Sequence, residues 1–464
     1  MDAPRALLST ELEDGLPHPR RFWAVVTIGI AVAMSILDAS IANVALPTIA
    51  ENLNASPAAS IWVINAYQLA IMILLLPLAS LGDIYGYRRV YVVGLIVFTM
   101  ASLLCATSAT LPMLASLRAV QGAGAAGLMS VNAALIRFTY PRLSLGRGIG
   151  INAFIIATSS AAGPTVAAGI LAIAQWQWLF LVNVPLGITA LALGIKYLPA
   201  NRRSPHRFDF WSAILNALAF GLLIVCIDGL GHGENGRFVA AVFVVALLFG
   251  ALFVWRQTVI PFPMLPVGLF ARPIFSLSVL TSIGSFIAQS MALVSLPFYF
   301  EHALGLSQVQ TGLLITPWPL TIAVVAPIAG RLADRYPAGI LGGIGLAVMA
   351  IGLALVAFLP AHPSMTDVAW RMTICGFGFG AFQSPNNRAI LANAPRERSA
   401  GAGAIISTAR LLGQTTGTAM VSLIFGLGAA SAAAASHAES TSILVGAGFA
   451  AAAAIISSLR LMQR

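Results

Sequence analysis

Long apolar runs alternate with short polar segments along the whole chain. A bilayer core of roughly 30 Å needs about 20 apolar residues per helix. Transmembrane barrels instead use segments of about ten residues with alternating hydrophobicity. The pattern therefore predicts an all-α integral membrane protein. The helical windows are expected to start near Phe22, Ser60, Arg89, Pro112, Gly148, Trp178, Phe210, Phe238, Pro273, Gln308, Ile340, Val368, Ala400 and Thr441, which makes fourteen.

Composition supports this class. Of the 464 residues, 59% are hydrophobic and 9% are charged, and the mean hydropathy is +0.90. Soluble domains carry about 25% charged residues. The three cysteines, Cys105, Cys226 and Cys375, lie in apolar windows without CxxC or CxxH spacing. Neither a disulfide framework nor a zinc site is expected, and the cysteines are interpreted as small core residues.

The placement of basic residues predicts the topology, since Lys and Arg concentrate in cytoplasmic loops. With the N-terminus inside, 21 of the 25 basic residues fall in cytoplasmic loops or tails, and two, Arg237 and Arg371, fall outside. The last two, Arg118 and Arg410, lie within helical windows. The net charge of +10 is thereby explained by topology and not by nucleic acid binding. Both termini are predicted to be cytoplasmic.

One carboxylate interrupts the first window, in the stretch SILDASIANVALPTI over residues 35–49. Asp at a helix centre costs roughly 2.5 to 3.5 kcal/mol on insertion, so Asp38 is expected to face a partner or a wet cavity. It lies about sixteen residues past Phe22, which places it roughly 24 Å along the helix, in the outer half. Pro47 cannot bond the carbonyl of Asn43, which predicts a weakened turn there. An ordinary membrane-helix proline is the alternative.

Arg118 is the second deep charge of this part of the chain. It lies about 9 Å from Pro112 at the outer end of its window, within a helix turn or two of the depth of Asp38. Since a carboxylate can take up a proton or pair with a cation, a proton and a substrate cation can compete for Asp38. A fixed ion pair or a hydrogen-bonded helix contact is the structural alternative. The sequence leaves open whether Asp38 and Arg118 touch.

Two loop segments resemble each other, LGDIYGYRRV over 81–90 and LADRYPAGI over 332–340. Each follows a window that runs from outside to inside, as in a pair of parallel repeats. Two extra apolar windows separate the halves. The predicted domains are a cytosolic tail (1–21), an N-terminal six-helix bundle (22–200), two linker helices (201–260) and a C-terminal six-helix bundle (261–464).

Five stretches of the sequence carry a family resemblance. They are LDASIANVALPTI (37–49), LASLGDIYGYRR (78–89), SLRAVQGAGAA (116–126), SAAGPTVAAGIL (160–171) and WLFLVNVPLG (178–187). Together, in this order, they resemble the major facilitator superfamily, specifically its fourteen-helix drug:proton antiporter branch. The chain departs from the family's loop motif at Ala79, where the motif has glycine, and at Ile84 and Tyr87, where it has arginines. It departs from the exporter motif at Ala167 and Ala168, where that motif has glycines.

The resemblance implies a major facilitator fold with two six-helix bundles, two additional central helices and alternating access. It implies that Asp38 carries the proton and that Arg118 couples this charge to conformation. Gly163 and Pro164 are implied to form a packing surface that seals an exporter against proton leak. A conformational latch is implied for the loop residues Asp83, Arg88, Arg89, Asp334 and Arg335.

Polar and aromatic residues inside the windows are the candidates for a substrate cavity, because aromatic faces suit flat or cationic compounds. Packing or a position at the lipid interface is the alternative role for these residues, and for Arg410 the alternative is a structural arginine that bonds backbone carbonyls. These candidates are Asn43, Trp62, Tyr67, Gln68, Gln121, Asn132, Gln289, Trp318, Phe382, Asn386 and Arg410.

The sequence and the resemblance together predict a monomeric antiporter of the bacterial inner (cytoplasmic) membrane that exports hydrophobic, cationic drugs in exchange for protons. Such multidrug efflux would confer antibiotic resistance. Export of an endogenous metabolite, a lipid-like molecule, a siderophore or an anionic drug is the first alternative, and a receptor or scaffold that moves nothing is the second. The chain has no GxxxxGK[ST] motif and no catalytic or metal-ligand cluster. The expected partners are small molecules, protons and lipid, with no cofactor, metal, ATP or nucleic acid.

Overall fold

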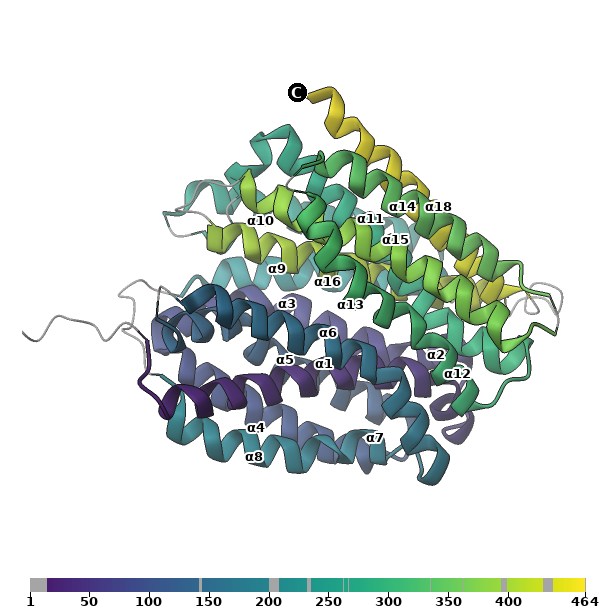
Figure 1. Ribbon diagram of the computed structural model, residues 1–464, viewed down its shortest axis with the longest axis horizontal. Coiled ribbons are helices and arrows are strands. Elements are labelled where there is room, and N and C mark those ends of the chain that lie inside the picture. The colour runs from purple at the N-terminus through teal and green to yellow at the C-terminus, as the bar shows by residue number, and fades with distance from the viewer. Residues whose placement is uncertain are drawn as a thin grey trace, which may run out of the picture.

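The computed structural model describes residues 15–141, 144–199, 208–231, 235–261, 263–265, 267–333, 335–360, 362–393, 399–428 and 437–463 (Figure 1). Every element in these ranges is helical. The helices are α1 (Arg20–Asn52), α2 (Pro57–Ser60), α3 (Trp62–Tyr85), α4 (Tyr87–Ala106), α5 (Leu111–Thr139), α6 (Leu145–Ile173), α7 (Trp178–Leu181), α8 (Asn183–Tyr197), α9 (Phe210–Gly231), α10 (Gly236–Val259), η2 (Val267–Ala271), α11 (Pro273–Phe298), η3 (Tyr299–Ala303), α12 (Gln308–Ile315), α13 (Pro317–Leu332), α14 (Ala338–Ala357), α15 (Met365–Ala392), α16 (Ser399–Gly428), α18 (Ala438–Leu459) and η5 (Arg460–Gln463).

The apolar windows predict where the helices begin. Each of the fourteen predicted starts lies within three residues of an observed helix start, the largest offsets including Ser60 against Pro57. Thirteen helices of the described chain are long and apolar enough to cross a membrane. Helix α15 is as long as these but is not among the thirteen; it carries Arg371 and Arg388 as well as several amides. The all-α membrane fold is confirmed.

The helices form an N-terminal half (α1 to α8) and a C-terminal half (α11 to α18). In Figure 1 the purple-to-blue N-terminal half lies below the green-to-yellow C-terminal half. Within the first, α5 packs against α3 and α4, and α1 packs against α6 and α8; within the second, α15 packs against α13 and α14, and α11 packs against α16 and α18. We call the end where α1 begins and α18 ends the termini end. The other end is the opposite end.

The two halves share one hydrophobic core at the opposite end. Ile49 of α1 lies in the same buried cluster as Phe298 of α11. The hydroxyl of Ser422 on α16 donates to the carbonyl of Ala58 on α2 at 3.2 Å. At the termini end the buried clusters of the halves are largely separate, and Leu411 with the partly buried Leu412 carries α16 into the cluster of the N-terminal half. Within the described chain, packing therefore joins the halves mainly at the opposite end.

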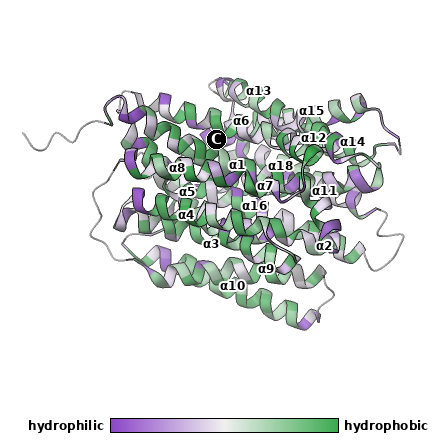
Figure 2. Ribbon diagram, turned by 90° about the horizontal axis from the view of Figure 1, so that it is seen from below, coloured by the Kyte–Doolittle hydropathy of each residue, from purple (hydrophilic) through white to green (hydrophobic). Residues whose placement is uncertain are grey.

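Helices α9 and α10 cover the seam from one side. Helix α9 packs on α3 and α16, and α10 packs on α9, along the lower edge of Figure 2, with hydrophobic residues along both. Arg256 of α10 binds Asp209, just before α9, through both carboxylate oxygens, the shortest contact being 2.7 Å. Partial burial opposes ionisation of Asp209, but hydrogen bonds from Arg256 and Ser212 hold its pKa below the usual value. This pair fastens the two extra helices to each other.

Candidate functional site

Asp38 lies at the centre of a buried polar network in the N-terminal half. Its side chain receives hydrogen bonds from Arg118 at 2.5 Å, from Gln121 at 2.8 Å and from Asn183 at 2.8 Å. These partners lie on α5 and α8, whereas Asp38 is on α1. Asp38 is 2% exposed and Arg118 is 1% exposed. The carboxylate thus meets a partner, as expected of a deep charge, and is closed to solvent in this conformation.

The guanidinium group of Arg118 makes further contacts with α3, with Gln121 and with two aromatic rings. Its Nε donates to the carbonyl of Val63 on α3 at 3.0 Å, and its Nη1 also donates to the side-chain oxygen of Gln121 at 2.6 Å. The guanidinium carbon stands 4.1 Å from the ring centroid of Tyr67 and 5.5 Å from that of Phe180. Aromatic faces stabilise a cation placed over them. The charge is therefore compensated by one carboxylate, two oxygens and two rings.

The geometry makes this network sensitive to a change of charge. A buried ion pair whose partners are both present is close to neutral in stability, but removing one partner leaves an uncompensated charge that costs roughly 3 to 5 kcal/mol. Gln121 links the pair onward, because its amide nitrogen also donates to Ser102 on α4 at 2.8 Å. A proton added to Asp38 would disturb contacts among α1, α4, α5 and α8 at once.

Sequence reasoning missed three members of the network, Asn183, Ser102 and Cys105. The thiol of Cys105 lies 3.8 Å from the side-chain oxygen of Gln121. Asn183 stands inside the quoted stretch WLFLVNVPLG, where its amide, placed among apolar residues, was the available signal. Ser102 and Cys105 gave no such signal, since small polar residues are common in membrane helices.

A cavity of about 50 Å³ lies between the two halves. Three predicted cavity residues line it, Asn43 of α1, Gln289 of α11 and Trp318 at the start of α13, together with Pro164 of α6. Side-chain oxygen Oδ1 of Asn43 and Nε1 of Trp318 are buried without a hydrogen-bond partner. Since buried polar atoms are nearly always paired, this acceptor and this donor suit a ligand or ordered water. The other lining residues are Ser40, Val44, Ser160, Leu293, Ile315, Pro319 and Ile322, all uncharged.

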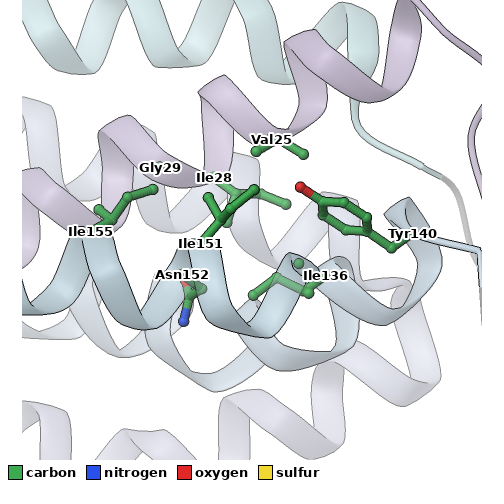
Figure 3. Close-up of a pocket in the computed structure, with 9 residues that line it drawn as sticks. Val25, Ile28, Gly29, Ile136, Tyr140, Ile151, Asn152 and Ile155 are labelled. Carbon is green, nitrogen blue, oxygen red and sulfur yellow. The ribbon is translucent and has the colours of Figure 1, made fainter. Parts of the chain in front are cut away.

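A second pocket, shown in Figure 3, lies within the N-terminal half between α1, α5 and α6. Ile28, Ile151 and Ile155 point into it, and the ring of Tyr140 closes one side. Its volume of about 10 Å³ is at or below the space that one water molecule requires. This pocket is a packing gap and not a substrate site.

Helix α1 continues unbroken through Pro47, to Asn52. The predicted weakened turn therefore does not end the helix and stays a prediction, while the side-chain oxygen of Asn43 is unpaired and Asn43 lines the cavity.

Helix α6 carries the packing motif between the two halves. A side-chain carbon at Gly163 would lie 2.3 Å from the hydroxyl oxygen of Ser40 on α1. The hydroxyls of Thr165 and Thr316 are 2.8 Å apart across the halves. Glycine at position 163 therefore allows α6 to approach α1 closely, while Thr165, two residues farther along α6, contacts the C-terminal half.

Replacing Gly312 of α12 by alanine is expected to loosen the contact with α6 and to lower the melting temperature. The added carbon would lie 2.6 Å from the carbonyl oxygen of Pro164 and 2.7 Å from Cβ of Ala168. Overpacking of this kind costs roughly 1 to 3 kcal/mol. Gly150→Ala, on α6 where the added carbon meets nothing within 4 Å, is the matched control. Equal melting of the two variants would contradict the close contact.

The first predicted latch segment bonds within its own half. Tyr87 donates a short hydrogen bond to Asp83, and Arg88 donates to the carbonyl of Ile195 on α8. Gly86 turns the chain between α3 and α4 with φ of 105°, a backbone conformation that L-residues rarely adopt. Tyr87 thus supplies a partner at the position where the family motif has an arginine.

Two of the other three latch residues, Arg89 and Arg335, are exposed. The third, Asp334, lies outside the described residues. The latch role of all five residues stays a prediction.

Three cavity candidates lie elsewhere in the N-terminal half. Gln68 accepts a hydrogen bond from Thr418 of α16 at 3.1 Å, which crosses between the halves. Asn132 donates to Asn152 of α6 at 3.2 Å. Trp62 begins α3 and is partly exposed. Tyr67 and Gln121, two more candidates, belong to the Asp38 network.

Two candidates are internal to the C-terminal half. Phe382 is 1% exposed and packs on Phe379. Asn386 accepts a hydrogen bond from Arg460 at 2.7 Å and donates to the carbonyl of Ser278 at 3.2 Å. Neither lines the cavity between the halves. Arg460, expected from its position to be a tail residue, is 4% exposed and fastens the end of α18 to α11 and α15.

Two helical halves around a cavity, with a buried ion pair in one of them, define the class of multi-pass membrane transporters. The chain belongs to the Major Facilitator Superfamily, which matches residues 28–418. Its fold resembles that of a bacterial homolog of the human lysosomal transporter Spinster in an inward-facing, unoccupied conformation, with a TM-score of 0.70, 15% identity, and coverage of 97% of this chain and 99% of that chain.

Sequence relatives span nearly the same length. The chain is 53% identical to the uncharacterized transporter YebQ of Escherichia coli, over 97% of this chain and 98% of that protein. It is 32% identical to the riboflavin transporter RibZ of Clostridioides difficile, over 87% and 88%. It is 31% identical to the multidrug efflux pump LfrA of Mycolicibacterium smegmatis, over 88% and 81%.

Proposed function

We propose that this transporter is a proton-coupled antiporter of the bacterial cytoplasmic membrane that exports hydrophobic organic compounds by alternating access. The observation that carries the proposal is the buried Asp38 carboxylate, bound by Arg118, Gln121 and Asn183. It is an ionisable group whose charge state governs how α1 packs on α5 and α8. The similarity to LfrA supports export.

Coupling follows from the contacts. While Asp38 is charged, Arg118 is neutralised and the helices of the N-terminal half are fastened together. Protonation removes the attraction and leaves Arg118 a buried cation, which is unfavourable until the surrounding helices move. The number of protons bound at this site is therefore linked to the conformation of the N-terminal half. In this proposal Asp38 carries the proton and Arg118 senses its charge.

The accessible side follows from topology. The distribution of basic residues supports a cytoplasmic termini end, and the halves share a core mainly at the opposite end. The conformation is then inward-facing, with the cavity lined by Asn43 and Trp318 on the substrate path. We assign α15 as the fourteenth transmembrane helix, and α9 and α10 as the two linker helices of the predicted domain division.

The uncharged walls of the cavity suit hydrophobic compounds with a few polar groups. Asp38 was expected to sense cationic drugs, but both of its carboxylate oxygens are engaged by protein donors. Selection for cations therefore gains no support from the cavity. Transport of an endogenous metabolite is the second candidate, which the similarity to the riboflavin transporter RibZ favours.

Everted membrane vesicles energised by respiration test the proposal. A panel of amphipathic compounds is added, and the pH gradient is followed with a fluorescent dye. At least one compound is expected to collapse part of the gradient in vesicles with the transporter and not in vesicles without it. The compound is chosen from a susceptibility screen in a strain that lacks its own pumps. Uptake of such a compound without any proton movement would contradict antiport.

A further inference from the structure

The deep charges of the chain do not balance. Arg118 and Arg410 both lie well inside long helices, whereas Asp38 is the only acidic residue in the middle of a long helix of the described chain. Both carboxylate oxygens of Asp38 already accept hydrogen bonds, from Arg118 and from the side-chain amides of Gln121 and Asn183. No acidic side chain at this depth remains for Arg410.

Arg410 has no partner among the described residues. Its Nε is buried and makes no hydrogen bond, and none of the hydrogen bonds or ion pairs of the described residues includes this side chain. The side chain as a whole keeps partial exposure. A buried donor without an acceptor is unfavourable, and more so when it belongs to a charged group. The cost is understandable if a molecule from outside the chain supplies the negative charge.

The helical geometry of α16 places Arg410 on the side of the helix that faces the interface between the two halves. Gly413 and Gly417 face α11, since an added carbon at each would lie 2.6 Å from a carbonyl oxygen of that helix. Thr418 lies where α3 and α11 meet, because its hydroxyl is 3.1 Å from the side-chain oxygen of Gln68 on α3 and 2.8 Å from the hydroxyl of Ser290 on α11. At about 100° per residue, Arg410 and Gln414 fall between these two faces. This is the side of α16 that is turned toward α11 and α3, the two helices on which α16 packs.

Arg410 does not line the cavity but lies near it along the helix axes. Gly413 lies against Phe286 of α11, and Gln289, three residues farther along α11, lines the cavity. Arg410 precedes Gly413 by three residues. At 1.5 Å per residue it lies about 9 Å from Gln289 along the helix axes, toward the termini end. A ligand with an aromatic body of two or three rings spans this distance.

We propose that Arg410 binds an anionic group, a carboxylate or another oxyanion, of an amphipathic organic substrate whose hydrophobic part occupies the cavity beside Trp318. The inference rests on the proposed transport function and names its substrate class. A guanidinium matches an oxyanion with two parallel hydrogen bonds. Gln414, one turn farther along the same face, offers a further donor.

Matched acid and amide pairs test the substrate class. Binding of benzoate, 2-naphthoate and 1-pyrenecarboxylate is compared with that of the corresponding carboxamides, by calorimetry on the purified full chain in detergent with protein-free micelles as blank. At least one acid is expected to bind tenfold more tightly than its amide. The preference should fall to about twofold or less in Arg410→Gln and be partly retained in Arg410→Lys. Arg237→Gln, at the opposite end, should keep it in full.

Stability gives a second readout that needs no ligand. Without ligand, Arg410→Gln is expected to melt at the same temperature as the wild type or higher, because a charged group with a buried, unpaired Nε is removed. A fall in melting temperature as large as that of Arg118→Gln would show that the protein itself pairs Arg410, and would overturn the proposal. No preference for any acid, or an undiminished preference in Arg410→Gln, would also overturn it. Because binding is measured without a proton gradient, failure of antiport leaves this result intact.

Discussion

Asp38→Asn is expected to abolish proton exchange. In everted vesicles, the collapse of the pH gradient on adding a transported compound should fall by more than tenfold. Asparagine keeps the shape of the side chain and one oxygen acceptor for Arg118, but an amide neither takes up nor releases a proton in the physiological range. The initial rate of the gradient change, at equal amounts of protein in the membrane, is the measurement.

Asp209→Asn is the matched control for this variant. Asp209 is also held by an arginine, Arg256, and hydrogen-bonded by Ser212, but it lies outside the Asp38 network. Its proton exchange should equal that of the wild type. Normal exchange by Asp38→Asn would overturn the coupling role, while a loss in both variants would trace the defect to folding or insertion.

Arg118→Gln is expected to cause the largest loss of stability. It leaves the Asp38 carboxylate buried with amide donors and no positive charge, a situation that costs roughly 3 to 5 kcal/mol. The free energy of unfolding in detergent, from a denaturant titration, is the measurement. Arg256→Gln is the comparison, because this ion pair is partly exposed, 32% on the arginine side, and such pairs contribute about 1 kcal/mol or less.

The double variant Asp38→Asn with Arg118→Gln separates charge from packing. Since both charges are then absent, the double variant should be more stable than Arg118→Gln alone, and the two effects should be far from additive. Additive losses would show that the pair contributes through shape alone. A loss in Arg118→Gln no greater than in Arg256→Gln would mean that the buried charge is compensated by other groups.

Local sequence was sufficient for the helices and for the most important charge. The starts of the windows near Phe22, Trp178 and Pro273 are matched within a few residues, because a stretch of about 20 apolar residues is recognisable by itself. Asp38 could be singled out because one carboxylate in such a stretch is costly wherever the neighbouring helices lie. The small residues of α6 likewise signalled a close helix contact before the partner was known.

Which side chains share a cavity depends on more than the local sequence. Asn43, Gln289 and Trp318 do line one cavity, but Phe382 and Asn386 are internal to the C-terminal half. A residue inside a membrane helix can face lipid, a neighbouring helix or a cavity, and one step along the helix turns it by about 100°. The rotation is set by packing against other helices.

The sequence by itself determined an all-helical membrane transporter, the places where its helices begin and the two deep arginines with one deep aspartate. The tertiary structure decided that Arg118, Gln121 and Asn183 bind both carboxylate oxygens of Asp38. It also decided that Arg410 has no partner within the described chain and that the halves share a core at one end. The physical reason is the distance along the chain over which each property is set. Hydrophobic length is a property of one segment, whereas charge pairing and cavity walls depend on how several distant segments are rotated against one another.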